Sequence, residues 1–316
     1  MSAVMTPVER PARRARQARQ AFLRACHWDV AVRKPGNVSH LSTGHGMQAR
    51  QFIDSALACA DLLCRPGAAV GERIEAAVTA TRARVGCNTN LGILLLCAPL
   101  ARAAEALEGL PADASTLRAA VQWVMAGLTL EDAAAAFRAI ARASPGGLGE
   151  VQAQDVRQRP GVTLREAMAL ASGRDRIALQ YVTGGAELFD VGLKALAAAD
   201  PGGGRLGGQG LPATAARPAE AAVVQAVYLA YLASAPDSHI VRKHGPALAQ
   251  TVMDQAGPWR DRLRDGGALD ADPAWVAWDE TLKARGLNPG TSADLTVATL
   301  MLADLLAWPD AADALA

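Results

Sequence analysis

The chain has 316 residues, of which 51% are apolar and only 4% aromatic, and its formal net charge is +1. A net charge so close to zero gives no indication that the overall field attracts nucleic acid or a membrane surface. The scarcity of aromatic residues and the abundance of alanine favour closely packed helices over a β-sandwich, because strands prefer aromatic and β-branched residues.

The predicted elements are helices along the whole chain. Apolar residues recur at helical spacing, as in Ala21, Phe22, Ala25 and Trp28, and no convincing strand-like alternation is found. In chain order, helices are expected at residues 10–33, 47–63, 70–84, 91–107 with a kink at Pro99, 116–126, from 129, within 163–199, and at 215–234, 239–256, 273–285 and 291–307. We therefore predict an all-α fold, a single multi-helix globular domain over residues 1–316.

Proline, glycine and capping residues mark the boundaries of these helices. Lys34-Pro35-Gly36 ends the first helix, because proline removes a backbone donor and pushes its predecessor out of the helical region. N-terminal caps are expected at Ser115, at Thr129 with Asp132, at Thr163 with Glu166, and at Thr291 or Ser292. Residues 144–160 form a loop, and the glycine-rich residues 201–212 predict a mobile loop or a linker.

Cysteine usage and the basic N-terminus bear on the compartment. The five cysteines form no CxxC pair and several lie among apolar residues, which indicates small buried thiols in a reducing cytosol. No apolar run reaches the roughly 18 residues of a membrane-spanning helix, and no secretory apolar core follows the arginines of residues 10–19. These arginines form a solvated helix face or contact a phosphate. We expect a cytoplasmic protein that binds neither nucleic acid nor a membrane.

Polar motifs interrupt the apolar helices and are the candidate functional sites. Lys34 beside the Pro35-Gly36 turn places a cation near backbone amides, which suits a phosphate, although a simple helix-ending turn explains the residues equally well. Asn88, Thr89 and Asn90 precede a helix, where they serve either as caps or as part of an anion site at the positive end of the helix dipole.

Two later motifs bring basic and acidic residues together. Asp237 precedes a helix whose first turns carry His239, Arg242 and Lys243, and Asp294 lies in the first turn of the last helix. Lysine, arginine, histidine and carboxylates at loop ends are the groups needed to hold Mg²⁺ and a polyphosphate. Zinc or iron is not favoured, because the histidines lack the HExxH spacing.

Taken in order, these motifs resemble those of the triphosphoribosyl-dephospho-CoA synthase family. The matching segments are KPGNVSH at 34–40, GCNTNLGILLL at 86–96, GGLGE at 146–150, TLREAMALASGRDRIALQY at 163–181, PDSHIVRKHG at 236–245 and NPGTSADLTVATLML at 288–302. The resemblance implies an all-helical enzyme that joins the ribose C1 of ATP to the 2′-hydroxyl of 3′-dephospho-CoA and expels adenine.

The motifs depart from the citrate-lyase branch of that family at two places. That branch typically carries KPGLVDR and then GAHxDM, whereas this chain has KPGNVSH and then GHGMQA, without the aspartate. It also tends toward GVNTHKG where this chain has GCNTNLG. The chain is more similar to the branch found beside one-carbon and tetrahydromethanopterin genes, which leaves the acceptor open.

The resemblance and the residue chemistry together suggest roles for individual residues. Lys34, Arg242 and Lys243 are expected to hold the triphosphate with Mg²⁺. Asp237 and Asp294, ahead of Asp175, are expected to stabilise the sugar cation, to take the acceptor's proton, or to bind the metal. Asn88, His40 or His239 would assist the departure of adenine. The catalytic set is thus Asp237, Asp294 and His239, and Asn37, Thr89, Asn90 and Ser292 complete the binding site.

Two alternative functions stay open at this point. One is a related ATP-dependent ribosyl or phosphoribosyl transfer to another acceptor in tetrahydromethanopterin-type cofactor biosynthesis. The other is a helical protein that binds a nucleotide without catalysis. The expected partners are small molecules, namely ATP with dephospho-CoA or a related acceptor, and the sequence leaves room for a homodimer.

Overall fold

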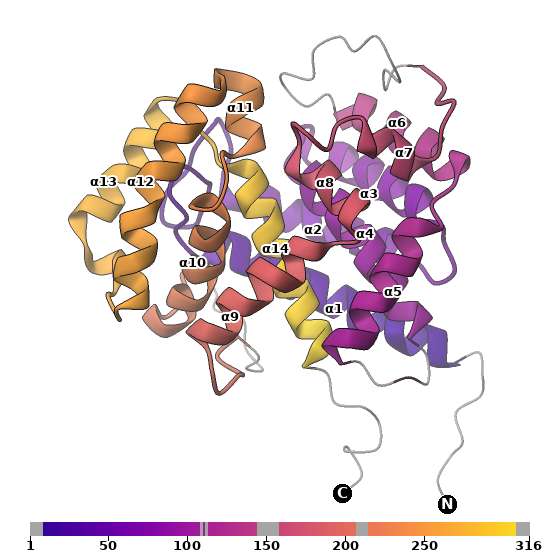
Figure 1. The fold of residues 1–316 in the computed structure, drawn as a ribbon, viewed down its shortest axis with the longest axis horizontal. Helices are drawn as coiled ribbons and strands as arrows, with labels where there is room; N and C mark the ends of the chain where they lie inside the picture. Colours follow the sequence, from indigo (N-terminus) through magenta and orange to yellow (C-terminus); the bar gives the residue numbers. More distant parts are fainter. Residues whose placement is uncertain (1–8, 108–109, 111–112, 144–157, 207–213, 308–316) are drawn as a thin grey trace, which may run out of the picture.

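The computed structural model describes residues 9–107, 110, 113–143, 158–206 and 214–307 (Figure 1). Within these ranges the chain forms α-helices, one π-helix and one 3-10 helix but no strand, which confirms the all-α prediction. None of the helices described is long and apolar enough to cross a membrane. The helices are α1 Glu9–Ala31, α2 Ala49–Leu63, α3 Val70–Val85, α4 Leu91–Ala106, α5 Ala114–Ala126, α6 Leu130–Ala143, α7 Leu164–Ala169, α8 Arg176–Thr183, η1 Leu188–Leu193, α9 Lys194–Ala199, α10 Pro218–Leu232, α11 Ser238–His244, α12 Pro246–Arg264, η2 Leu269–Ala271, α13 Pro273–Ala284 and α14 Gly290–Leu306.

Two clusters of buried apolar side chains organise these helices. The larger cluster draws mainly on α1–α8 and the middle of α14, and the smaller one on α10–α13 around Trp275. Helices α10 and α14 contribute to both clusters, and in Figure 1 α14 lies between the two groups of helices. The start of α14 is therefore placed where the two groups meet, which matters for the site described below.

Most helix boundaries follow the predicted signals. Thr163 and Glu166 form the predicted capping box at α7, and Thr129 and Asp132 bond each other's backbone amides at the start of α6. The predicted cap Ser115 is wrong: the carboxylate of Asp113 accepts hydrogen bonds from the Ser115 and Thr116 amides, both at 2.8 Å. An aspartate one position before the helix satisfies two free amides, which a serine inside the helix cannot do.

The predicted helix 239–256 is two helices. It divides at Gly245, whose φ of 88° lies in the left-handed region that glycine tolerates, and Pro246 then begins α12. The cap predicted at Thr291 or Ser292 is also wrong, because α14 begins at Gly290 and both residues lie inside it. These differences shorten α11 to the segment that carries His239, Arg242 and Lys243.

Two predicted loops lie partly or wholly outside the described residues. Residues 144–157, which include the GGLGE segment, are not described, and neither are residues 207–213 of the glycine-rich stretch. The five cysteines are free thiols, and all except Cys87 are buried, as expected from their apolar neighbours.

Candidate active site

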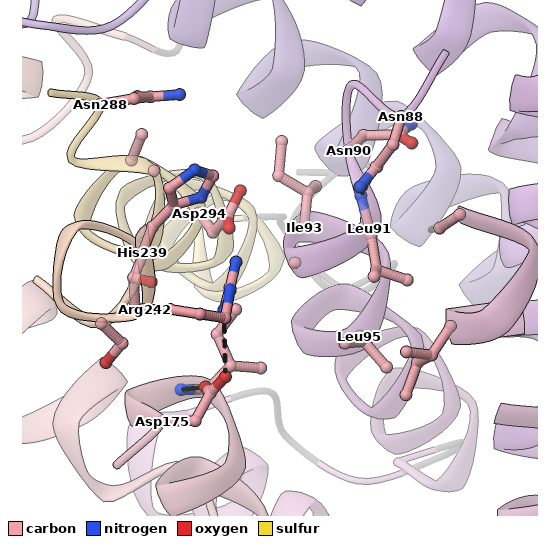
Figure 2. A pocket seen from close by; sticks show the side chains of 18 of the residues that line it. Asn88, Asn90, Leu91, Ile93, Leu95, Asp175, His239, Arg242, Asn288 and Asp294 are labelled. Atoms are coloured by element: carbon pink, nitrogen blue, oxygen red, sulfur yellow. Dashed lines mark hydrogen bonds and ion pairs between the residues drawn. The ribbon is translucent and has the colours of Figure 1, made fainter. Parts of the chain in front are cut away.

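A cavity of about 720 Å³ opens where α4, α8, α11 and α14 meet. This volume falls within the range of about 300–1,000 Å³ that is typical of small-molecule sites. Figure 2 shows side chains of α11 and α14 on one side of the cavity and those of α4 and the preceding loop on the other. Segments that are far apart in the sequence meet here, so the fold, and not any single motif, creates the site.

The structure brings most, but not all, of the predicted site residues to this cavity. Those that line it are Asn37, Asn88, Thr89, Asn90, Asp175, His239, Arg242, Lys243 and Asp294. Those that do not are Lys34, His40, Asp237 and Ser292. His40 is exposed on the loop after α1, and the other three are buried in hydrogen-bond networks behind the cavity wall.

The turn after α1 is a rigid part of the fold. Each backbone carbonyl of residues 33–36 accepts a hydrogen bond, and three of the donors come from outside the turn. In chain order of the carbonyls, the four donors are the Gln225 side chain at 3.1 Å, the Asn37 amide at 2.9 Å, the Tyr228 hydroxyl at 2.7 Å and the His45 ring at 2.8 Å; only Asn37 belongs to the turn. Because its polar groups are satisfied in this way, the turn has one defined conformation.

Lys34 is fully buried and does not line the cavity. Its ammonium group lies 2.9 Å from the carboxylate of Asp29 and also donates to the backbone carbonyl of that residue. Asp29 belongs to the last turn of α1, where the helix dipole disfavours an anion, and the lysine offsets this effect. The lysine that sequence reasoning assigned to the triphosphate therefore pairs with a carboxylate that itself lines the cavity.

The same turn packs against the loop before α14. Gly36 has a φ of 81°, and a Cβ at this position would come within 2.7 Å of both the Leu287 carbonyl and the Pro289 ring. The side-chain amide of Asn37 donates to the side-chain oxygen of Asn288 at 3.1 Å. Both asparagines line the cavity, so contact between the two loops places them there together.

Asp237 links the starts of two helices. One carboxylate oxygen accepts from the amides of His239 and Ile240, and the other accepts from the amide and the hydroxyl of Ser292. Both oxygens are thereby engaged, and the residue is 1% exposed. Asp237 and Ser292 thus join α11 to α14 and lie behind the cavity surface.

Asp294 projects from the beginning of the second turn of α14 toward α4 (Figure 2). Its carboxyl group packs against Gly92, where an added Cβ would lie only 2.0 Å from Oδ2. Among the described residues the side chain has no hydrogen-bond or salt-bridge partner. Burial raises the pKa of Asp294 well above its ordinary range, and the nearby carboxylates of Asp29 and Asp237 raise it further. These effects favour the protonated acid.

His239 lies beside Asp294 on the wall of the cavity (Figure 2). Burial, together with the positive charges of Arg242 and Lys243, lowers the pKa of His239 to about 3. Its imidazole is therefore neutral near pH 7 and can form hydrogen bonds without carrying a charge.

The opposite wall is the start of α4. Asn88 caps the helix by accepting a hydrogen bond from the Leu91 amide at 3.1 Å, and the Thr89 hydroxyl donates to Ser55 at 2.7 Å. Asn90 is 5% exposed, and its side-chain oxygen has no hydrogen-bond partner among the described residues. The helix therefore presents its positive end to the cavity, and the Asn90 side-chain oxygen lies buried beside it without a described partner.

Positive charge reaches the cavity from three segments. Arg242 of α11 lies 3.7 Å from Asp175, and Lys243 beside it is exposed. Arg82 of α3 and Arg174, just before α8, also line the cavity and are exposed. Arginine and lysine side chains arranged in this way suit a polyphosphate.

Sequence reasoning missed Asp29 and Arg82 as site residues, and it noted Arg174 only as part of the segment at 163–181. The sequence does carry a signal for Asp29. This residue lies seven positions after Phe22 and four after Ala25, so it places a carboxylate on the apolar face of α1. Arg82 carries no comparable signal, since exposed arginines are common on helices, whereas Arg174 belongs to the segment at 163–181 that carries the family resemblance.

The predicted metal ligands do not form a site of their own. No group of three histidine, cysteine, aspartate or glutamate side chains that could hold a metal occurs in the described ranges. Asp237 and Asp294 do not fit a shared metal site, because both oxygens of Asp237 are already bonded and only Asp294 lines the cavity.

A family model and a solved structure are similar to this chain. Residues 15–312 match the family described as ATP:dephospho-CoA triphosphoribosyl transferase. A solved structure described as a triphosphoribosyl-dephospho-CoA synthase from Archaeoglobus fulgidus is similar in fold, with a TM-score of 0.57 and 20% identity over 82% of this chain and 99% of that chain. No curated protein matches the chain. Because the family match covers nearly the whole chain, the chain belongs to the ATP:dephospho-CoA triphosphoribosyl transferase family.

Proposed function

We propose that the cavity between α4, α11 and α14 transfers the triphosphoribosyl group of ATP to the 2′-hydroxyl of 3′-dephospho-CoA and releases adenine. The family supports this reaction over transfer to another acceptor and over binding without catalysis. The observation that carries the proposal is that one cavity presents basic side chains and a carboxyl group, that of Asp294, which is left without a partner in the described part of the chain.

We propose that the triphosphate binds at the basic side of the cavity. Arg242 and Lys243 from α11 face it, and Arg82 and Arg174 extend the positive surface toward solvent. The amides at the start of α4 add the positive end of a helix dipole. Lys34 is omitted from this set, because its ammonium group is buried against Asp29.

In this proposal Mg²⁺ binds together with the triphosphate. Magnesium is commonly held by one or two carboxylates together with substrate phosphates and water. The residues present suit that arrangement better than a metal cage made by the protein alone, and when bound the ion would neutralise phosphate charge. The chain's own residues bind and orient the substrates.

We propose that the leaving adenine lies near Asp294 and His239. Breaking the bond between ribose C1 and the purine nitrogen creates oxocarbenium character at the sugar, as in glycoside hydrolysis. Asp294, kept protonated by burial, can donate its proton to the departing base. The neutral imidazole of His239 and the side-chain oxygen of Asn90, which has no partner among the described residues, are available to hydrogen-bond the purine or the sugar.

The proposal also includes the cytoplasm as the compartment. Free thiols are typical of reducing compartments, and the cysteines of this chain are free. Both proposed substrates are nucleotides, which are plentiful in that compartment.

Adenine release tests the proposed reaction and the role of Asp294 together. Incubating the protein with ATP, Mg²⁺ and dephospho-CoA should release adenine and add one triphosphoribosyl group to the acceptor, both measured by mass spectrometry. Asp294→Asn should lower the rate by about 10²–10⁴, the usual contribution of one acid–base group. Asp304→Asn is the matched control, since burial also raises the pKa of Asp304 and this residue lies on the same helix but outside the cavity.

Two outcomes would count against the proposal. Adenine release that does not depend on dephospho-CoA would point to another acceptor or to water. Full activity of Asp294→Asn would remove this carboxyl group from the chemistry while leaving the family's reaction in place.

A further inference from the structure

We propose that Asp29 is the base that takes the proton from the acceptor hydroxyl, and that Lys34 is the positioning residue that holds Asp29 in place. This inference rests on the proposed transfer reaction. It assigns chemistry to a residue outside the sequence motifs, and it gives the turn after α1 a task other than phosphate binding.

Asp29 is a nearly buried carboxylate at the cavity wall. The residue lines the cavity while being only 3% exposed, so its carboxylate is nearly excluded from water. A buried carboxylate without a counter-charge is costly. The ammonium group of Lys34, 2.9 Å from the Asp29 carboxylate, supplies the opposite charge.

Lys34 cannot leave Asp29 to bind a substrate. Its side chain is 0% exposed, and its ammonium group is also bonded to the Asp29 carbonyl. Its backbone belongs to the turn in which the carbonyls of residues 33–36 are all bonded. Swinging the ammonium group into the cavity would break this arrangement and leave a buried carboxylate without a partner, which is costly.

The carboxyl groups of Asp29 and Asp294 have contrasting environments. Asp29 has a cation in contact, whereas Asp294 has no partner among the described residues and lies against Gly92. The charge of Asp29 is itself the largest electrostatic influence on Asp294 that favours the protonated form. Two carboxyl groups in environments that differ in this way commonly divide the roles of base and acid.

The resulting step is balanced in atoms and electrons. The acceptor oxygen forms a bond to ribose C1 while its proton passes to the Asp29 carboxylate. The bond from C1 to the adenine nitrogen breaks, its electron pair stays with adenine, and the Asp294 proton completes the base. A proton then returns from Asp29 to Asp294 through solvent, which restores the starting state without any oxidant or reductant.

The test compares catalysis with ATP binding in Asp29→Asn, Lys34→Met and Lys34→Arg. Asp29→Asn should lower kcat by about 10²–10⁴ while ATP affinity, measured by calorimetry, stays near that of the wild type. Lys34→Met should also lower kcat and leave ATP affinity little changed, and Lys34→Arg should recover part of the rate. A loss of ATP affinity in Lys34→Met with kcat retained would show that Lys34 binds phosphate, and would overturn the inference.

The double variant Asp29→Asn with Lys34→Met separates positioning from folding. It removes both charges, so it should unfold no more readily than Lys34→Met alone, because no unpaired buried charge remains. If Lys34 acts through Asp29, the lysine substitution lowers kcat no further once Asp29 is replaced. Additive losses would contradict the proposal.

A matched lysine–aspartate pair serves as the control. Lys283 lies 2.9 Å from the buried Asp279, and neither residue lines the cavity. Lys283→Met should therefore keep kcat. A wild-type protein that releases no adenine would overturn the proposed reaction itself, whereas an active wild type with a fully active Asp29→Asn would overturn only the role given to Asp29.

Discussion

Gly92 has an unusual position for a glycine in the first turn of a helix. Glycine within a helix commonly costs about 0.5–1 kcal/mol relative to alanine, so its replacement is usually stabilising. Here the space that a Cβ would fill is taken by the carboxyl group of Asp294, at 2.0 Å, and by Ile177, at 2.8 Å. The absence of a side chain at Gly92 is what allows Asp294 to lie against α4.

We therefore expect Gly92→Ala to lower activity without adding stability. The new methyl group would displace the Asp294 carboxyl group from its place, although every proposed catalytic group is still present. Adenine release and urea unfolding measure the two effects. Gly257→Ala is the matched control: it lies inside α12, a Cβ added there would have nothing within 4 Å, and the variant should gain about 0.5–1 kcal/mol. A stable, fully active Gly92→Ala would contradict the geometry of Asp294.

At the scale of single residues, the sequence predicts which residues line the cavity better than it predicts which partners they contact. His239, Arg242 and Asp294 are expected in the site and do line the cavity. Lys34 is expected at the phosphate, but its contact with Asp29 depends on how α1 ends and on which face of the helix the carboxylate lies. Spacing along the chain does not reveal whether a lysine after a helix points back at that helix or outward.

At the scale of elements, α4 shows how a proline is accommodated in a buried helix. Pro99 lies inside the helix and has no amide to donate to the carbonyl of Leu95, four residues earlier. The hydroxyl of Tyr181, from α8, donates to that carbonyl instead, at 2.7 Å. The helix predicted to kink at Pro99 is assigned as continuous from Leu91 to Ala106, and α8 is bonded to it at this point.

Tyr181→Phe should destabilise the protein by about 1–3 kcal/mol, the cost of a buried polar group left without a partner. The penalty should shrink when Pro99→Ala is also present, because an alanine at that position restores an amide that can reach the Leu95 carbonyl. Urea unfolding of the two single variants and the double variant forms the required cycle. An equal cost for Tyr181→Phe in both backgrounds would mean that the hydroxyl acts elsewhere.

Element boundaries are predictable where one local signal decides them. The Thr163–Glu166 capping box and the break at residues 34–36 are local in this sense. The π-helix η1 is not predictable, because Gly192 must fit against the hydroxyls of Thr299 and Tyr231, which are distant in sequence. The division at Gly245 carries a visible signal in the Gly-Pro pair, which the apolar periodicity on both sides obscures.

At the scale of the whole molecule, the cavity joins the two groups of helices. Its walls come from α4 and α6–α8, which belong to the larger apolar cluster, and from α11, which packs in the smaller one. A ligand that contacts both walls stabilises the folded protein to an extent set by its affinity and concentration. The site therefore lies at the contact between the two groups of helices.

ATP should slow amide hydrogen exchange in α11 and at the start of α4 together. At a free concentration of one hundred times Kd it should add about 2.7 kcal/mol to the free energy of unfolding. Exchange measured by mass spectrometry with and without ATP, and thermal unfolding, check both effects. Protection confined to one wall would indicate that the nucleotide does not bridge the cavity.

The junction between the turn at residues 34–37 and the loop at 287–290 has a consequence for synthesis on the ribosome. Asn37 meets Asn288, 251 positions later in the chain, and Gly36 packs against Pro289, so two walls of the site are made at very different times. Because α14 also fills the larger apolar cluster, α1–α8 cannot complete their core until α14 emerges from the ribosome. Nucleotide binding should then be the last property that the growing polypeptide acquires, and any incomplete translation product that lacks α14 would be unable to sequester ATP.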